Sequence, residues 1–180
     1  MEGESLSISF EETICVGIFL IDKVEFRSAL SQFATGVTVI TTVGDDGQPH
    51  SMTANAFSSI CLDPPTVMVC IAHNAHSHGF LQKTKKFGVN ILTQEQEELG
   101  VYFAKKLEDR TGGVDYEYTM AENQVPILEG SMVFFSCEVV GTHDYGDHTI
   151  YVGVVKEMRR DEPSAPLMFY NSRWYNPAGD

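Results

Sequence analysis

The chain has 180 residues, of which 43% are hydrophobic and 11% aromatic, so it can bury the core of one domain and is not intrinsically disordered. It carries 12 basic against 25 acidic residues, and the resulting net charge of −13 repels nucleic acid and anionic lipid at long range. We therefore expect no nucleic-acid partner. Any phosphate of a ligand must be held by local hydroxyls, backbone N–H groups or a few lysines.

The N-terminal segment contains one apolar stretch, Ile14–Ile21, which is short and follows acidic rather than basic residues. It is too short for a membrane span and lacks the basic start of a signal peptide. We expect no membrane segment and a cytoplasmic location. Residues 1–22 are predicted to be an extension ahead of a single domain, residues 23–180. The extension could be an added strand, an arm over a partner subunit, or a start-site or cloning artefact.

A helix is predicted to begin at Asp22. Asp22 and Glu25 have the spacing of an N-cap residue and its N3 partner, and Gly36 offers a stop. Apolar residues recur between them at helical intervals, at Val24, Phe26, Leu30 and Phe33. The pattern indicates an amphipathic helix.

Alternating β-branched residues predict a strand over 37–43, followed by turn residues at 45–47 and a returning strand with its loop over 51–59. The apolar run 66–71 does not alternate and indicates a central buried strand. Residues 87–92 read as a further strand.

Two more helices follow from capping signals. Ser77 is placed to cap a short helix that carries Phe80 and Leu81. Thr93 and Gln96 form a capping-box pattern, and the helix that follows is predicted to end near Glu108.

The stretch 112–126 lacks a periodic pattern and is long enough to be a functional lid. The β-rich runs 132–140 and 149–155 are joined by hairpin-turn residues at 144–147. Five or six strands interrupted by three short helices indicate a closed antiparallel barrel with helical additions.

One run stands out because it is dense in small hydroxyl and amide side chains where a core strand should be apolar. It spans Ser51–Pro65, reads SMTANAFSSICLDPP, and would let the backbone approach a flat ligand closely. The run resembles the flavin-contacting segment of the short-chain flavin reductases, members of the FMN-binding split-barrel superfamily. Further matching pieces lie within residues 23–175, including Phe26–Thr42, Phe87–Leu92, Gln96–Ala104, Gly146-Asp147-His148 and Pro166-Leu167.

The resemblance implies a mainly β fold with α additions: an FMN-binding split β-barrel, antiparallel and of Greek-key type, with flanking helices. It places Thr53, Ala54 and Asn55 at the flavin ring and Ser58 and Ser59 on the phosphate side. The alternative is a polar barrel rim with solvated hydroxyls.

Residues 73–78 hold three histidines near Cys70, but their spacing fits no strong zinc motif. We expect no metal site. A helix N-terminus carrying Ser77 and aimed at an anion is the more economical reading, and it coincides with a phosphate-binding loop of the family. Asn90 is expected to be a satisfied strand-edge residue that could line the same pocket. The cysteines show no CxxC spacing and are expected to be reduced and buried, namely Cys15, Cys61, Cys70 and Cys137.

No Gly-x-Gly-x-x-Gly motif follows a strand, so a Rossmann dinucleotide site is excluded. By the resemblance, Gly146, Asp147 and His148 form the family's Gly-Asp-His element, in which the imidazole faces the nicotinamide nucleotide. The alternative is that Asp147 makes the turn and His148 is a surface histidine. Hydride transfer needs no protein acid or base, so no residue is assigned that role.

The resemblance implies an NAD(P)H:flavin oxidoreductase that reduces FMN or FAD, with NADH favoured over NADPH, and supplies reduced flavin to a separate monooxygenase. Other readings are a flavoprotein that reduces ferric chelates or corrinoids, and a non-catalytic flavin-binding protein. A homodimer is expected because the family builds its flavin site at a subunit junction. The monooxygenase, its substrate and the preferred flavin are open.

Overall fold

The computed structural model describes residues 21–162 and 164–175. Residues 1–20, nearly all of the predicted extension 1–22, lie outside them. The described helices are α1 (Lys23–Leu30), α2 (His76–Thr84) and α3 (Glu97–Ala104), with short 3-10 turns η2 (Gln94–Gln96) and η3 (Leu107–Asp109). The strands are β1 (Thr35–Gly36), β2 (Thr38–Val43), β3 (Pro49–Ala54), β4 (Phe57–Leu62), β5 (Pro65–Ala72), β6 (Lys86–Ile91), β7 (Tyr118–Met120), β8 (Pro126–Leu128), β9 (Val133–Tyr145), β10 (His148–Arg160), β11 (Met168–Tyr170) and β12 (Arg173–Tyr175).

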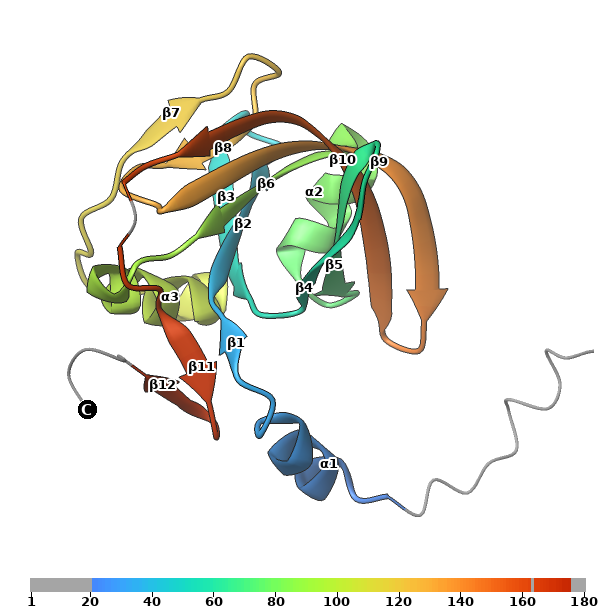
Figure 1. Cartoon of the computed structure of the whole chain (residues 1–180), viewed down its shortest axis with the longest axis vertical. Helices are drawn as coiled ribbons and strands as arrows, with labels where there is room; N and C mark the ends of the chain where they lie inside the picture. The colour runs from blue at the N-terminus through green and yellow to red at the C-terminus, as the bar shows by residue number, and fades with distance from the viewer. Residues whose placement is uncertain (1–20, 163, 176–180) are drawn as a thin grey trace, which may run out of the picture.

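Most of the described strands form one curved antiparallel sheet with the order β3-β2-β6-β9-β10-β5-β4 (Figure 1). Its inner face packs a core of buried aliphatic and aromatic side chains, the largest of them Tyr151, Phe87, Ile40, Ile71 and Leu81. The prediction of a mainly β, antiparallel fold with helical additions is confirmed. The predicted closure is not seen, because β3 and β4 stand at opposite ends of the strand order.

Helix α1 begins as predicted, with the Asp22 carboxylate accepting hydrogen bonds from the N–H groups of Val24 and Glu25. It ends at Leu30 rather than near Gly36, which instead belongs to β1. None of its residues is buried, and the helix stands away from the curved sheet (Figure 1). Among the described residues, none covers its apolar stripe.

The capping signals of the other helices have mixed outcomes. The Thr93–Gln96 capping box is present on η2. Helix α3 stops at Ala104, short of the predicted Glu108, because the backbone of Lys105 is already extended. The prediction that Ser77 caps α2 is wrong: the N-cap position is Ala75, and Ser77 lies inside the first turn.

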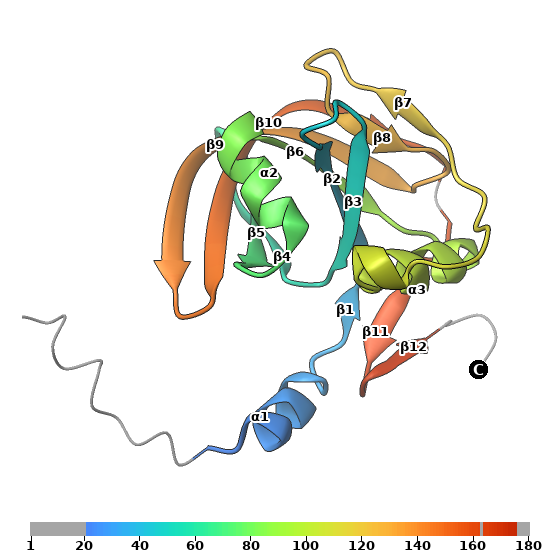
Figure 2. The same ribbon diagram turned by 180° about the vertical axis from the view of Figure 1, so that it is seen from behind.

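Strands β9 and β10 form a long hairpin that turns at Gly146, whose φ of +58° suits a residue without a Cβ atom. The turn predicted at 144–147 is thus confirmed. The stretch 112–126 is not wholly irregular, since it contains β7, which pairs with β8 (Figure 2). A small sheet, β1-β11-β12, was not predicted because its strands are only two or three residues long.

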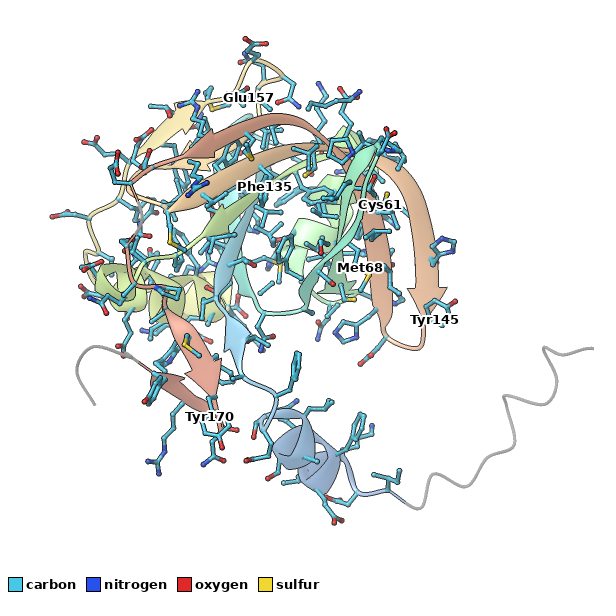
Figure 3. All side chains as sticks on the ribbon, viewed as in Figure 1. Cys61, Met68, Phe135, Tyr145, Glu157 and Tyr170 are labelled. Atoms are coloured by element: carbon cyan, nitrogen blue, oxygen red, sulfur yellow. The ribbon has the colours of Figure 1, made fainter. Side chains whose placement is uncertain are left out.

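Two expectations about single residues need correction. Cys137 is buried and Cys70 partly buried, but Cys61 is exposed because β4 is an edge strand whose outer face nothing covers in the described chain (Figure 3). Asn90 lies on an interior strand, not an edge. Its amide donates to the carbonyl of Val39 and accepts from the N–H of Leu128, so it is satisfied, as expected.

Candidate functional site

The edge strand β3 borders a hollow of about 230 Å³, here called the ring hollow. Small side chains, Ala54 and Ala104, leave room beside two aromatic walls, Phe169 and Trp174, whose rings meet edge to face at 5.4 Å. The remaining lining residues are Val37, Thr53 and Asn55. Thr53 is oriented by its hydroxyl, which donates to the carbonyl of Gly100 at 2.7 Å. The three residues predicted to contact a flat ring therefore share one flat-walled hollow.

A second hollow, about 310 Å³ in volume, adjoins the first through Thr53 and Ala104 and is here called the anion hollow. One wall is the segment 74–77 at the start of α2, and the other is the segment 104–110 after α3. Its lining includes three cationic side chains, Lys105, Lys106 and Arg110, and one carboxylate, that of Glu108. In a chain with only 12 basic residues, this concentration makes the hollow locally suited to an anion.

Ser77 and His50 meet at the wall of the anion hollow, with the serine Oγ 3.0 Å from the imidazole Nε2. The imidazole also packs edge-on against Phe80 at 4.9 Å. Burial lowers the pKa of His50 to about 4, and the charges of Arg110 and His76 act in the same direction. His50 is therefore neutral at physiological pH, and the positive charge of the hollow comes from its lysines and arginine.

Ser58 and Ser59 do not join this group. They lie exposed on β4, at the opposite end of the sheet order from β3, and line neither hollow. The hydroxyl of Ser58 donates to the carbonyl of Ser59.

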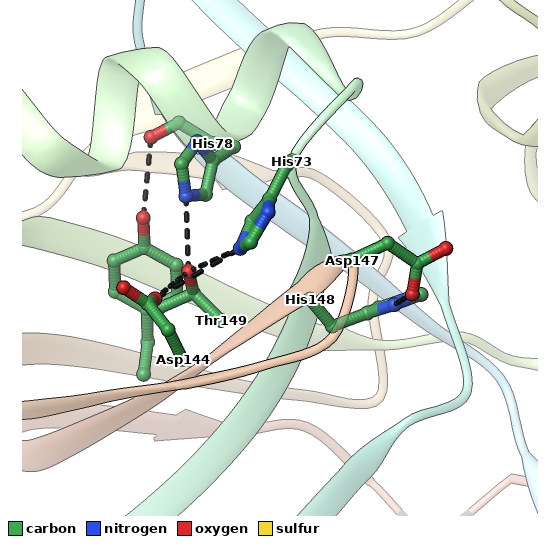
Figure 4. A network of polar contacts seen from close by, with 7 residues as sticks. His73, His78, Asp144, Asp147, His148 and Thr149 are labelled. Carbon is green, nitrogen blue, oxygen red and sulfur yellow. Dashed lines mark hydrogen bonds and ion pairs between the residues drawn. The ribbon is translucent and has the colours of Figure 1, made fainter. Parts of the chain in front are cut away.

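The Gly-Asp-His turn is tied to α2 by a polar network around Thr149, which is buried (Figure 4). Its hydroxyl lies 2.5 Å from the Asp144 carboxylate, 3.1 Å from His73 Nε2 and 3.0 Å from His78 Nε2. A hydroxyl has one proton, so when it donates to Asp144 both imidazoles must donate their Nε2–H to it. Burial lowers the pKa of His78, which favours this neutral arrangement.

The same turn holds His148 in a defined place. The backbone N–H of His73 donates to the backbone carbonyl of Asp147. The Asp147 carboxylate accepts a hydrogen bond from His148 Nδ1 at 2.7 Å. That hydrogen bond and the charge of His148 lower the pKa of Asp147. His148 leaves half of its side chain exposed and free to meet a ligand (Figure 4).

A larger hollow of about 520 Å³, here called the α1 hollow, lies between α1 and the sheet. It shares Asn55 and Phe169 with the ring hollow, and β5 contributes Met68 and Cys70. His148 pairs with Ala72 on β5, and alternate residues of a strand share a face, so His148 projects on the same face as Cys70. The side chain of His148 and the α1 hollow, which adjoins the ring hollow, therefore lie on the same face of β5 and β10.

No group of three metal-ligating side chains occurs among residues 21–162 and 164–175. No helix in that part of the chain is long and apolar enough to span a bilayer.

Known proteins of one family resemble this chain in sequence and in fold. The family model described as the flavin reductase like domain matches residues 30–178. An NADH-dependent flavin reductase of Rhodococcus is 38% identical over 152 residues, which cover 83% of this chain and 84% of that protein. The reductase subunit HsaB of a flavin-dependent monooxygenase from Mycobacterium tuberculosis is 37% identical over 153 residues, covering 83% of this chain and 80% of that protein.

Solved structures show the same relationship. The flavin reductase PheA2 superposes with a TM-score of 0.79 at 39% identity and covers 86% of this chain and 97% of its own. The styrene monooxygenase flavin reductase of Pseudomonas putida S12 gives 0.76 at 37% identity, with 84% and 97% covered. This chain belongs to the flavin reductase-like family.

Several lining residues were missed by sequence reasoning. Lys105 and Lys106 could have been found, because adjacent lysines are conspicuous in so acidic a chain. His50 and Arg110 carry no local signal. Phe169 and Trp174 reach the ring hollow only through the small sheet β1-β11-β12, whose short strands the pattern does not reveal.

Proposed function

We propose that this chain is an NADH:flavin oxidoreductase that reduces FMN or FAD by hydride transfer and supplies the reduced flavin to a separate monooxygenase. One observation carries the proposal: a flat, small-residue hollow adjoins a cationic hollow on one side and, on the other, a hollow on the sheet face that also carries His148. Family membership and relatives named as NADH-dependent flavin reductases support it. We propose NADH rather than NADPH because these relatives are named as NADH-dependent.

The residues present fit a flavin. Ala54 and Ala104 leave a slot that a larger side chain would fill, and Phe169 and Trp174 offer apolar walls for a ring system. Thr53 and Asn55 supply polar atoms at its rim, as predicted from the sequence. We propose that the phosphate lies in the anion hollow near Ser77, Lys105 and Lys106, rather than at Ser58 and Ser59.

Bound flavin would supply the acceptor for the hydride of NADH. The protein's part is to hold the two rings in contact and keep water from between them. We place the nicotinamide nucleotide in the α1 hollow, where Asn55 and Phe169 border both ligands and His148, held by Asp147, faces it from the turn at Gly146. The hydroxyl of Thr35 lines the α1 hollow and has no partner among the described residues, so a polar ligand there would satisfy it. No residue is required as acid or base.

We further propose that the curved sheet is the split barrel of this family and that two chains form a homodimer over the uncovered face of α1. The apolar residues of α1 are widely exposed, with Val24 at 77% and Leu30 at 58%, and an exposed apolar helix face of this kind is typical of an association surface. A cytoplasmic location stays a prediction, as does the separation of residues 1–22 from the domain 23–180.

The proposed function is tested by mixing the protein, NADH and FMN, FAD or riboflavin under anaerobic and aerobic conditions and following NADH absorbance. Consumption of NADH that depends on free flavin, saturates in both substrates and exceeds that of NADPH is expected. Bound flavin without NADH consumption would make the chain a binding protein. Turnover with ferric chelates or corrinoids but not with free flavin would assign it another acceptor.

A further inference from the structure

A fourth hollow, of about 200 Å³, continues the row that the ring and anion hollows form along β3, and is here called the aromatic hollow. Its walls are rings from α3, from the segment that precedes β7 and from the first residue of β7: Tyr102, Phe103, Tyr116 and Tyr118. Tyr116 contacts the other three rings: its ring centroid lies 5.9 Å from that of Tyr102, 5.1 Å from that of Phe103 and 5.5 Å from that of Tyr118. It is also 39% exposed, so part of its ring is open to a ligand.

The ring, anion and aromatic hollows follow one another along a single strand, β3. Thr53 and Ala54 border the ring hollow, His50 and Met52 the anion hollow, and Pro49 and Ser51 the aromatic hollow. At about 3.3 Å per residue, the six residues of β3 cover roughly 17–20 Å, the scale of an extended dinucleotide. From the end of β3 back to its start, the order is the flat ring hollow, the cationic anion hollow and the flat aromatic hollow.

Arg110 stands where the anion and aromatic hollows meet and lines both. Its guanidinium donates to the carbonyls of Ser51 and Phe103 at 2.9 and 3.2 Å, and its Cζ atom lies 5.3 Å from the centroid of the Phe103 ring. No carboxylate lies within ion-pair distance of it in the part of the chain that the structure describes. A half-buried cation without an acidic partner, in a chain of net charge −13, suits a bound anion.

We infer that the aromatic hollow binds the adenine ring of FAD, with the pyrophosphate held by Arg110 and the anion hollow, so that the site selects FAD over FMN. The inference rests on the proposed flavin reductase function and deepens it by naming which flavin fits. FMN would fill only the first two hollows. The extra hollow would then add affinity for FAD alone.

The chemistry of the aromatic hollow favours a neutral flat ring over another occupant. The hydroxyl of Tyr118 is hydrogen-bonded to Ser51 Oγ at 2.6 Å, and burial raises the pKa of Tyr118 to about 12, so no phenolate forms near neutral pH. Rings without charge stack well on any nucleobase face. The electron-poor guanidinium of Arg110 provides a second planar surface beside them.

The test compares dissociation constants of FAD, FMN and riboflavin for the wild-type chain and for Tyr116→Ala. Base stacking on an aromatic side chain is worth about 5- to 100-fold in affinity, so Tyr116→Ala should lose FAD affinity by that factor. FMN and riboflavin should bind unchanged, and Tyr116→Phe should retain the wild-type preference. Tyr170→Ala is a matched control, because Tyr170 is 42% exposed on β11 and lines none of the three hollows (Figure 3).

A second measurement needs no mutation. ADP should displace FAD from the wild-type protein, because it competes for the anion and aromatic hollows, and should leave riboflavin bound. Equal wild-type affinity for FAD and FMN, or an equal loss of both in Tyr116→Ala, overturns the inference while leaving the reductase function intact. Failure of riboflavin and FMN to bind or to be reduced would instead remove the proposed function itself.

Discussion

Individual side chains in the anion hollow have separable tasks. His50 and Ser77 bond to one another and shape the wall, whereas Lys105 and Lys106 are exposed and bring charge. Because the lysines hold no packed position, their replacement should alter ligand binding without altering the fold. This separation lets the phosphate position be tested residue by residue.

The double variant Lys105→Ala/Lys106→Ala should weaken FMN by about 10- to 100-fold and riboflavin hardly at all, since a hydrogen bond to a charged group is worth roughly 1.5–3 kcal/mol. Titration of each flavin against protein fluorescence measures the ratio. The matched variant Ser58→Ala/Ser59→Ala should leave both flavins unchanged. If the serine variant is the one that loses FMN selectively, the phosphate lies where the sequence resemblance placed it.

His148→Ala should raise the NADH Michaelis constant by about 3- to 30-fold, the scale of one hydrogen bond or stacking contact, with flavin affinity unchanged. Steady-state kinetics at saturating flavin measures it. Loss of flavin binding with unchanged NADH kinetics would assign His148 to the flavin. No effect on either would leave it as a surface histidine.

His50 should make the flavin-free protein sensitive to mild acid. Its pKa is lowered to about 4 by burial, so the unfolded chain takes up a proton at higher pH than the folded one. The stability that depends on neutral His50 is full above about pH 6.5 and is lost as pH falls toward 4. Allowing for its partial exposure, we expect the melting temperature to fall roughly 2–6 °C more across that range than in His50→Gln. Parallel melting curves for the two proteins would contradict this.

At the scale of elements, the network around Thr149 connects α2 to the hairpin of β9 and β10. Helix α2 also borders the anion hollow, so one element touches both the proposed phosphate site and the turn that carries His148. The two proposed ligand sites are thereby connected by a shared set of hydrogen bonds as well as by the hairpin backbone.

Thr149→Val removes the hydroxyl that His73, His78 and Asp144 share. We expect the NADH Michaelis constant to rise several-fold, flavin affinity to hold, and stability to fall by about 1–3 kcal/mol because buried polar groups lose their partner. Thr149→Ser should restore the kinetics, and Thr142→Val, on the exposed part of β9, should change neither property. Lower stability with wild-type NADH kinetics would reduce the network to a purely structural role.

Elements with a local signal could be predicted from the sequence, and those set by distant contacts could not. The Asp22 cap, the Thr93–Gln96 box and the turn before His148 depend on a few adjacent residues, and all three are present. Strand β11 exists because it pairs with β1, more than 130 residues away. Ser77 was misassigned as a cap because α2 already begins at His76, and its hydroxyl instead meets His50 on a distant strand.

At the scale of the whole molecule, the site depends on segments from every part of the chain. The ring hollow takes Val37 from near the start, Ala104 from the middle and Trp174 from near the end. The motif of residues 53–55 was enough to find one wall of this hollow. Its opposite wall could not be found, because no sequence pattern brings these segments together.

Dimerisation of the chain should be measurable by analytical ultracentrifugation. We expect a dimer of the 20.0 kDa chain at micromolar concentration, because nothing within residues 21–162 and 164–175 covers the apolar stripe of α1. Val24→Glu/Phe26→Glu should shift the protein toward monomer, since it places charge on that stripe without touching residues that line the hollows. A wild-type monomer that binds flavin fully would contradict the dimer.

The placement of Trp174 has an optical consequence. It is the only tryptophan of the 180 residues, and it forms a wall of the ring hollow. Indole emission overlaps flavin absorption, so an isoalloxazine seated against this wall would quench the chain's intrinsic fluorescence by energy transfer. The protein would thus contain its own reporter of occupancy, and stopped-flow emission could time the arrival and departure of flavin in each turnover without any label.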